Sequence, residues 1–176
     1  MHKVDTVDRA IVDLLMDDGR MSSADIARRI GDVSERSVRY RLQRLIDQNI
    51  IRVSAIPAPQ ALGFSVVADV FIEVEPGHVM DVARQVMEHT CVSYVACSTG
   101  DRDLSIQVVA RDNAELYRFV TEVVGKVPGV RKTSTVLVPL VLKDVYEWRI
   151  PASACSDSQE AGKGTGTLRA SCPLGM

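Results

Sequence analysis

Residues 20–49 read RMSSADIARRIGDVSERSVRYRLQRLIDQN and predict a short helix, a tight turn and a longer basic helix. In the longer helix, apolar residues recur at the 3.6-residue period of a helix that packs one side on its own domain. This apolar stripe consists of Val38, Leu42, Leu45 and Ile46. The helix is therefore expected to bury one side and to leave the other side open to a partner.

The side of this helix opposite the stripe carries hydrogen-bond donors. At about 100° per residue, it presents Arg36, Tyr40, Gln43 and Arg44, with Ser37 and Arg39 on its flanks. Guanidinium, amide and hydroxyl groups are the donors with which a recognition helix reads base edges in the DNA major groove. A surface helix with a solvated charged side would carry the same residues, so the neighbouring elements decide between the two interpretations.

Capping residues delimit three helices before residue 50. Asp5 can cap the first helix, Ser22 the second and Ser34 the third, because their side-chain oxygens accept hydrogen bonds from free N–H groups. Gly19 is expected to end the first helix and Asn49 the third, each with a positive φ. Three helices with a short Gly-containing turn between the last two form a helix-turn-helix.

After residue 56 the sequence pattern changes from helical to strand-like. Residues 50–56 predict a strand that would form a wing or pair with a partner chain, and Pro57, Pro59 and Gly63 mark a linker. The elements expected next are a strand at 66–74, a helix at 79–87, strands at 92–97 and 104–109, a helix at 116–124 and a strand at 130–142. The order β-α-β-β-α-β is that of the ferredoxin-like split motif. The predicted fold class is α+β, with an N-terminal winged helix-turn-helix followed by a ferredoxin-like βαββαβ domain.

Four regions follow from these patterns. We expect a helix-turn-helix domain over residues 1–56, a linker over 57–64, the βαββαβ domain over 65–150 and a disordered tail over 151–176. The tail is rich in Ser, Gly and Ala and has almost no large apolar residues. In the βαββαβ domain both helices cover one face of the sheet. Because the chain is so apolar, the other face should pack against a second copy, which predicts a homodimer.

The charge of the chain is unevenly distributed, although its net value is only −2. Residues 20–52 contain eight Arg against four acidic residues, whereas residues 63–150 contain nine Lys or Arg against twelve acidic residues. A basic patch on an acidic body is typical of a DNA-binding protein that also has a function outside DNA binding.

Several other classes of protein are not indicated by the sequence. No apolar run approaches the ~20 residues that span a bilayer, and the opening MHKVDTVDR is not a signal peptide, so we expect a cytoplasmic protein without a membrane partner. Cys91, Cys97, Cys155 and Cys172 form no C-x-x-C pair, and the three His are scattered. We therefore expect neither a metal site nor a disulfide framework.

Four stretches together resemble the Lrp/AsnC (feast/famine) family of transcriptional regulators, over roughly residues 4–150. VDTVDRAIVDLLMDDGRMSSADIARRI at 4–30 is similar to the family's first two helices, and SVRYRLQRLIDQNIIR at 37–52 is similar to its recognition helix and exit strand. PQALGF at 59–64 resembles the linker into the second domain. STGDRDLSIQVVARDNAELYRFV at 98–120 resembles the family's Gly-Asp-x-Asp loop with the strand and helix that follow it.

The resemblance implies a dimeric or octameric regulator that binds double-stranded DNA and responds to a small effector, usually an amino acid, without a cofactor. In similar proteins the effector lies in a cleft between subunits. The matching residues here are Thr99, Gly100, Asp101, Arg102 and Asp103 in the loop, with Thr133 and Thr135 in the last strand. Chemically, Asp101 or Asp103 could hold an α-ammonium group and Arg102 a carboxylate. The alternative is that these charges shape the loop and pair across the dimer interface.

For DNA contact, the first turns of the basic helix are the part that usually meets base edges. We expect base contacts from Arg36, Arg39 and Tyr40, and next from Ser37 and Gln43. Arg28, Arg29 and Arg44 are expected to contact phosphates, which position a protein without specifying sequence.

Two other classes of function compete with regulation for this sequence. Family-fold relatives that decarboxylate a tetrapyrrole place histidines in the cleft, but the loop at 98–103 contains none, and no nucleophile–base pair or phosphate-binding loop is found, so we expect no enzyme. A DNA-organising protein, or an amino-acid-binding assembly module without specific regulation, would use the same residues and stays open as the alternative.

Overall fold

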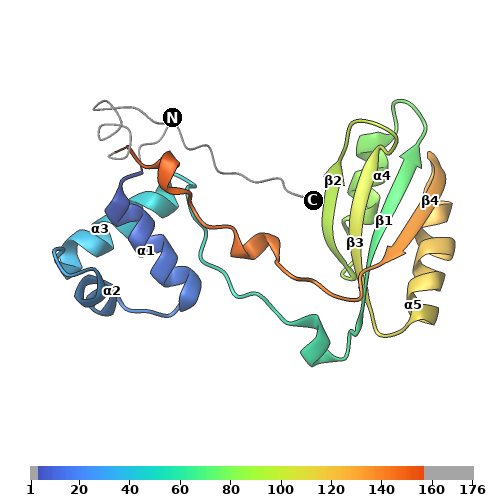
Figure 1. The fold of residues 1–176 in the computed structure, drawn as a ribbon. Helices are drawn as coiled ribbons and strands as arrows, with labels where there is room; N and C mark the ends of the chain where they lie inside the picture. The colour runs from blue at the N-terminus through green and yellow to red at the C-terminus, as the bar shows by residue number, and fades with distance from the viewer. Residues whose placement is uncertain (1–3, 157–176) are drawn as a thin grey trace, which may run out of the picture. The chain divides into compact units, whose positions relative to one another are not determined.

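The computed structural model describes residues 4–156, which divide into two compact units (Figure 1). Among the described residues, the helical unit comprises 4–55 together with 143–156, and the sheet unit comprises 56–142. Among residues 4–156, no helix has the length and apolar character needed to cross a membrane.

The helical unit contains the three expected helices, α1 (Thr6–Asp17), α2 (Ser23–Ile30) and α3 (Glu35–Asp47). All three predicted caps are confirmed, since Asp5, Ser22 and Ser34 each accept a hydrogen bond from the backbone N–H three residues later. Asn49 has the expected positive φ, 54°. The expectation for Gly19 is wrong, because its φ is not positive and the C-cap of α1 is Asp18, which is extended and donates its N–H to the carbonyl of Leu14.

Two small cores hold the helical unit together. Ile11, Ile26, Ala27 and Val38 bring one side of each helix into the first core. The second core consists of Val4, Val12 and Leu45, with Ile150 among the partly buried residues packed against it. Ile150 is 105 residues further along the chain than Leu45, so the helical unit is assembled from both ends of the described sequence.

The sheet unit has the predicted β-α-β-β-α-β order. Its strands are β1 (Val66–Val74), β2 (Val92–Cys97), β3 (Leu104–Ala110) and β4 (Val130–Leu137), arranged antiparallel in the order β2-β3-β1-β4. Helix α4 (Val79–Val86) joins the first two strands. Helix α5 (Asn113–Arg118) continues through a π-helical turn (Phe119–Val123) and a 3₁₀ turn (Val124–Lys126).

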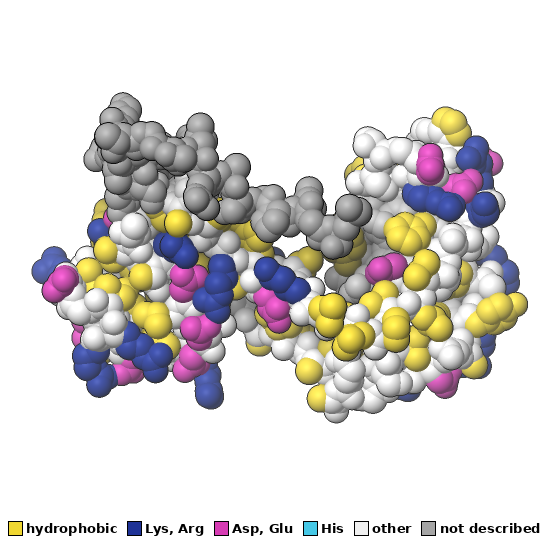
Figure 2. Space-filling view, viewed as in Figure 1, with side chains coloured by type: hydrophobic (Ala, Val, Ile, Leu, Met, Phe, Trp, Pro, Cys, Tyr) yellow, Lys and Arg dark blue, Asp and Glu magenta, His cyan; other side chains and the backbone are white. Residues whose placement is uncertain are grey.

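Both helices of the sheet unit lie on the same face of the sheet (Figure 1). Val82 and Val86 from α4, with Leu116 and Val120 from α5 and its continuation, pack against the alternate residues of β1 and β3 that are buried. The opposite face is uncovered. Figure 2 shows hydrophobic side chains gathered on the visible face of this unit, and the exposed fraction of Tyr94, on β2, is 51%.

Three expectations about element boundaries differ from the structure. The strand expected at 50–56 is not formed in this single chain, because residues 51–58 have no regular secondary structure. The last strand ends at 137 instead of 142, where Leu137 pairs with Ala68 near the start of β1, and Pro139 has no N–H with which to continue the ladder.

The domain boundary expected at 150 also differs. Residues 143–156 pack with the helical unit and contain two 3₁₀ turns, Val145–Glu147 and Ala152–Ala154. Residues 151–156 are therefore structured, although they were expected in the tail. The remainder of that expected tail, 157–176, lies outside the described residues.

Candidate DNA-binding helix and effector site

The outward side of α3 carries the side chains expected to read DNA. Arg36, Arg39, Tyr40 and Gln43 are exposed, with Tyr40 at 70%, and Ser37 is partly buried. Arg39 forms an ion pair with Glu35, and Gln43 donates a 2.8 Å hydrogen bond to Asp47. Because these contacts are exposed, they stabilise little and leave the donors available to a ligand. Within residues 4–156, no ion pair holds Arg36.

The two arginines of α2 that are expected to contact phosphates lie at the protein surface. Arg28 and Arg29 are both exposed near the end of the helix, and Arg28 pairs with Asp25 one turn earlier. Helix α2 packs directly on α3, with Ile26 and Ala27 of α2 and Val38 of α3 in one core. Helix α2 is therefore held directly against α3, and its arginines extend from an element that is fixed relative to that helix.

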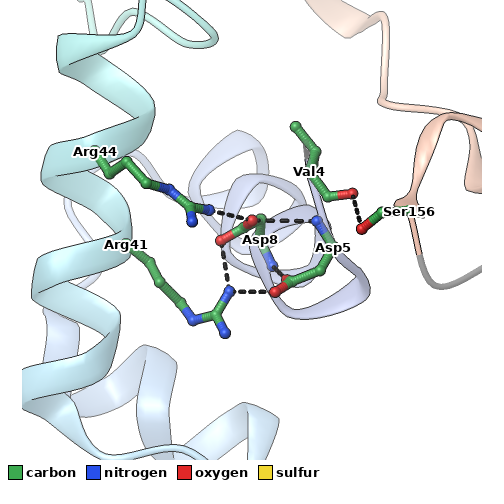
Figure 3. A network of polar contacts seen from close by, with 6 residues as sticks. All are labelled: Val4, Asp5, Asp8, Arg41, Arg44 and Ser156. Carbon is green, nitrogen blue, oxygen red and sulfur yellow. Dashed lines mark hydrogen bonds and ion pairs between the residues drawn. The ribbon is translucent and has the colours of Figure 1, made fainter. Parts of the chain in front are cut away.

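Arg44 has a different role from the one expected. It reaches inward from α3 to the carboxylate of Asp8 on α1, and Arg41 reaches the same carboxylate (Figure 3). The distance from Arg41 Nη1 is 2.8 Å to Asp8 Oδ1 and 2.6 Å to Asp5 Oδ2. The hydrogen bond to Asp5 is the largest of the effects that raise the pKa of Arg41. The proposed phosphate contact of Arg44 is therefore not supported by its placement.

Asp8 is the residue of this network whose importance the sequence did not indicate. Only 1% of it is exposed, and it is the one buried charged residue of the part that the structure describes. It also closes the capping box at the start of α1, where the Asp5 N–H donates to Asp8 Oδ2 at 3.2 Å and the Asp8 N–H donates to Asp5 Oδ1 at 2.8 Å. Its sequence position predicts only a negative charge in the first turn of α1, because its arginine partners lie more than 30 residues away along the chain.

The loop between β2 and β3 uses part of its charge within the chain. Asp103 Oδ2 accepts a 2.7 Å hydrogen bond from the Val74 N–H at the end of β1. Arg102 Nη1 lies 2.7 Å from Glu73 Oε1, so it is already paired. Gly100 has a φ of 129°, which a side chain would disfavour. Thr99, Gly100 and Asp101 are exposed, which leaves Asp101 as the carboxylate of this loop turned to solvent.

The two predicted threonines of β4 line a separate hollow. Thr133 pairs with Ile72 and Thr135 with Val70, and both of these β1 residues are fully buried under the helices. The threonines therefore face α5. Together they border a hollow of about 380 Å³, whose walls are Asn113, Leu116, Tyr117, Val120, Thr121, Thr133, Thr135 and Leu137.

Within one protomer the structure does not bring the two halves of the predicted effector site together. The loop adjoins β3, Thr133 lies on β4, and β1 separates these strands. At about 4.8 Å per strand spacing, the backbone of Thr133 is about 10 Å from the residue that follows the loop. The hollow and the loop are therefore two separate features of the sheet unit, because the hollow runs from Thr133 toward Leu137 and Asn113, away from the end of the sheet where the loop lies.

Comparison with known proteins assigns both units to one family. The model of the AsnC-type helix-turn-helix domain matches residues 4–46, and the model of the Lrp/AsnC ligand-binding domain matches residues 67–147. An HTH-type transcriptional regulator of Pyrococcus abyssi is 39% identical over 82% of this chain and 91% of its own length. The regulator LrpA of Pyrococcus horikoshii is 30% identical over 80% of this chain and 99% of its own length.

Solved structures show the same fold. AsnC of Escherichia coli matches with a TM-score of 0.75 at 21% identity, covering 82% of this chain and 99% of that one. A transcriptional regulator of Neisseria meningitidis in complex with L-methionine also matches with a TM-score of 0.75 at 21% identity, over 81% of this chain and 94% of that one. The helix-turn-helix, the βαββαβ domain and the identity with named regulators agree, and the chain belongs to the Lrp/AsnC family of helix-turn-helix transcriptional regulators.

Proposed function

We propose that this regulator reads DNA through Arg36 and Arg39, with Tyr40, Ser37 and Gln43 beside them, and that Arg28 and Arg29 bind phosphates. The observation that carries the proposal is the separation of the basic residues of α3 into two sets. Arg41 and Arg44 are held by Asp8, whereas Arg36 and Arg39 are exposed on the outward side. Only the outward set is free to enter a major groove.

The double variant Arg36→Ala/Arg39→Ala should lose specific DNA binding while the protein stays folded. An Arg–guanine contact provides about 1–3 kcal/mol of discrimination, so losing two should weaken binding to the correct site by about a hundredfold. The measurement is fluorescence anisotropy on the DNA upstream of the protein's own gene and on random DNA, across a salt series. The matched control is Arg84→Ala/Arg118→Ala, which removes two exposed arginines from the sheet unit. Equal affinity of the two double variants would refute the assignment.

We further propose that the effector is an amino acid with an apolar side chain and that this side chain enters the hollow between α5 and β4. Leu116, Val120 and Leu137 give the hollow apolar walls, and the hydroxyls of Thr133 and Thr135 supply polar groups at one side. Its volume is near the lower end of ligand pockets, which suits a molecule of this size. The methionine complex of a regulator with the same fold supports this choice of ligand class.

Filling the hollow should abolish the response to the effector. In Thr135→Leu the larger side chain occupies space beside Leu137 and Tyr117, so affinity should fall by about tenfold or more, which is about 1.4 kcal/mol. Calorimetric titration with each of the twenty amino acids, before and after the substitution, measures this. Ser93→Leu makes a comparable polar-to-apolar change on β2, at the opposite edge of the sheet, and should leave the titration unchanged. Unaltered binding in Thr135→Leu would place the effector elsewhere, and Asp101→Ala would then test the loop.

We also propose that the protein is a homodimer and that its dimers can assemble further, for example into an octamer. The uncovered face of the sheet supports this, because its apolar side chains include Tyr94 and Val136, each about half exposed. A face of this kind is normally covered by a partner, and a second copy of the same sheet is complementary to it.

A further inference from the structure

The chain that leaves the sheet unit after β4 returns to the helical unit and docks on it. Arg149 contacts two carboxylates of α1, with 3.3 Å from its Nη1 to Asp13 Oδ1 and a second ion pair from its Nη2 to Asp17. Ile150 packs against the core of Val4 and Leu45. Cys155 is fully buried and pairs with Val4 in a parallel β-bridge.

This docked segment, residues 149–156, holds the start of α1. The Ser156 N–H donates a 2.8 Å hydrogen bond to the carbonyl of Val4, and the Ser156 hydroxyl donates a second one of 3.3 Å to the same oxygen (Figure 3). Val4 directly precedes Asp5, the residue that caps α1 and accepts a hydrogen bond from Arg41. Four residues along, Asp8 holds both Arg41 and Arg44. A single residue, Val4, therefore connects the docked segment to Asp5 and to the ion pairs that hold the inner side of the recognition helix.

A second contact leads from the docked segment to the recognition helix without passing through α1. Leu45 of α3 is fully buried, and it lies in the same core against which Ile150 packs. The segment thus touches the inner side of the helix whose outer side carries Arg36 and Arg39. Losing the segment would leave Leu45 and Val4 partly uncovered and would allow α3 to shift against α1.

We propose that residues 149–156 position the recognition helix, so that tight binding to the correct DNA requires this segment to be docked. The inference rests on the proposed DNA-reading role of α3. It also gives the effector a route to the DNA, because the segment follows β4, whose Thr133 and Thr135 border the hollow. Docking and DNA binding are then coupled, and each must favour the other by the same factor.

Two truncations separate the docked segment from the residues after it. A chain that ends at Ser156 should bind its DNA as the full chain does, whereas a chain that ends at Trp148 should bind about tenfold more weakly. A full-length pair keeps the test independent of truncation. Ile150→Asp places a charge against the core and should undock the segment, and Val145→Asp places the same charge at a residue that is 72% exposed. Equal DNA affinity in Ile150→Asp and Val145→Asp would overturn the proposal.

Cys155 reports docking directly. In a full-length chain with Cys91→Ala, Cys97→Ser and Cys172→Ser, Cys155 is the sole thiol, and its labelling by a thiol reagent should be slow because it is fully buried. Ile150→Asp should speed the labelling, and Val145→Asp should not. Saturating specific DNA should slow the labelling of Cys155 about tenfold. This is the same factor by which undocking weakens DNA binding, because the coupling is reciprocal. Random DNA should slow the labelling less. Labelling that specific DNA leaves unchanged would contradict the coupling.

A readout without DNA distinguishes failure of this inference from failure of the proposed DNA-reading role. Hydrogen exchange of the α3 amides should be faster in Ile150→Asp than in Val145→Asp, because α3 has lost part of its support. If α3 exchange is unchanged, the segment does not position the helix, whatever the DNA result. If exchange rises but even the full chain does not prefer its upstream DNA, the fault lies in the proposed DNA-reading role and not in the positioning of α3.

Discussion

Replacing Asp8 by alanine should lower the free energy of unfolding of the helical unit by about 3 kcal/mol, near the lower end of the cost of removing one partner from a buried ion pair. Asp8 is buried, and its loss leaves Arg44 without a carboxylate and Arg41 with that of Asp5 alone. The side chains of Arg41 and Arg44 are 24% and 31% exposed, so water offsets part of the cost. Chemical denaturation followed by circular dichroism measures the change.

The control for Asp8 is Asp47→Ala. Asp47 is an exposed aspartate on α3 whose side chain accepts one hydrogen bond from Gln43, so its removal should change the free energy of unfolding by no more than about 0.5 kcal/mol. A double-mutant cycle of Asp8→Ala with Arg44→Ala should show a coupling of about 0.5–3 kcal/mol, because the two side chains are in contact. An Asp8→Ala protein as stable as Asp47→Ala would contradict the role given to this carboxylate.

Gly129→Ala should destabilise the sheet unit by about 3 kcal/mol through two separate effects. Gly129 has a φ of 93°, and holding alanine in a left-handed conformation costs roughly 1–2 kcal/mol. An added Cβ would also lie 2.7 Å from the Cβ of His78, which is too close for either backbone to keep its place. Overpacking of this kind costs roughly 1–3 kcal/mol. Urea denaturation of the purified protein gives the value.

Gly77→Ala isolates the first of these effects. Gly77 has a similar φ of 88°, but a Cβ there meets nothing within 4 Å. This variant should therefore lose only about 1–2 kcal/mol, the cost of the backbone conformation alone. If the two alanine variants are equally stable, the contact between residue 129 and His78 does not contribute to the loss of stability. The close packing of Gly129 on His78 would then not constrain the fold.

The local elements could be predicted because their causes lie within a few residues. Ser22, Ser34 and Asn49 act on their own helices, and the alternation along β1 reports which of its sides is buried. The order of elements then led to the ferredoxin-like arrangement without any knowledge of long-range contacts.

What could not be predicted depends on contacts between distant parts of the chain. Arg44 has the residue type and the position on its helix that are typical of a phosphate ligand. Only the packing of α1 on α3 shows that it binds Asp8 instead. The stretch 149–156 has no periodicity, so its sequence resembles a tail, and its structure comes from Val4 and the α1 carboxylates. The predicted effector residues lie in two places, the loop before β3 and the hollow beside β4. This separation depends on the order and register of the strands, which sequence spacing does not give.

The docked segment also bears on how the protein is made. Ser156 bonds to Val4 across a separation of 152 residues, so the helical unit spans nearly the whole described chain. During synthesis, domains generally fold as units from the N-terminus onward, yet this N-terminal unit lacks its last piece until residue 156 has left the ribosome. The sheet unit, at 56–142, is contiguous and can fold first. A nascent regulator would thus acquire its sensing half before its DNA-binding half is complete, which delays contact with the genome until residue 156 has been made.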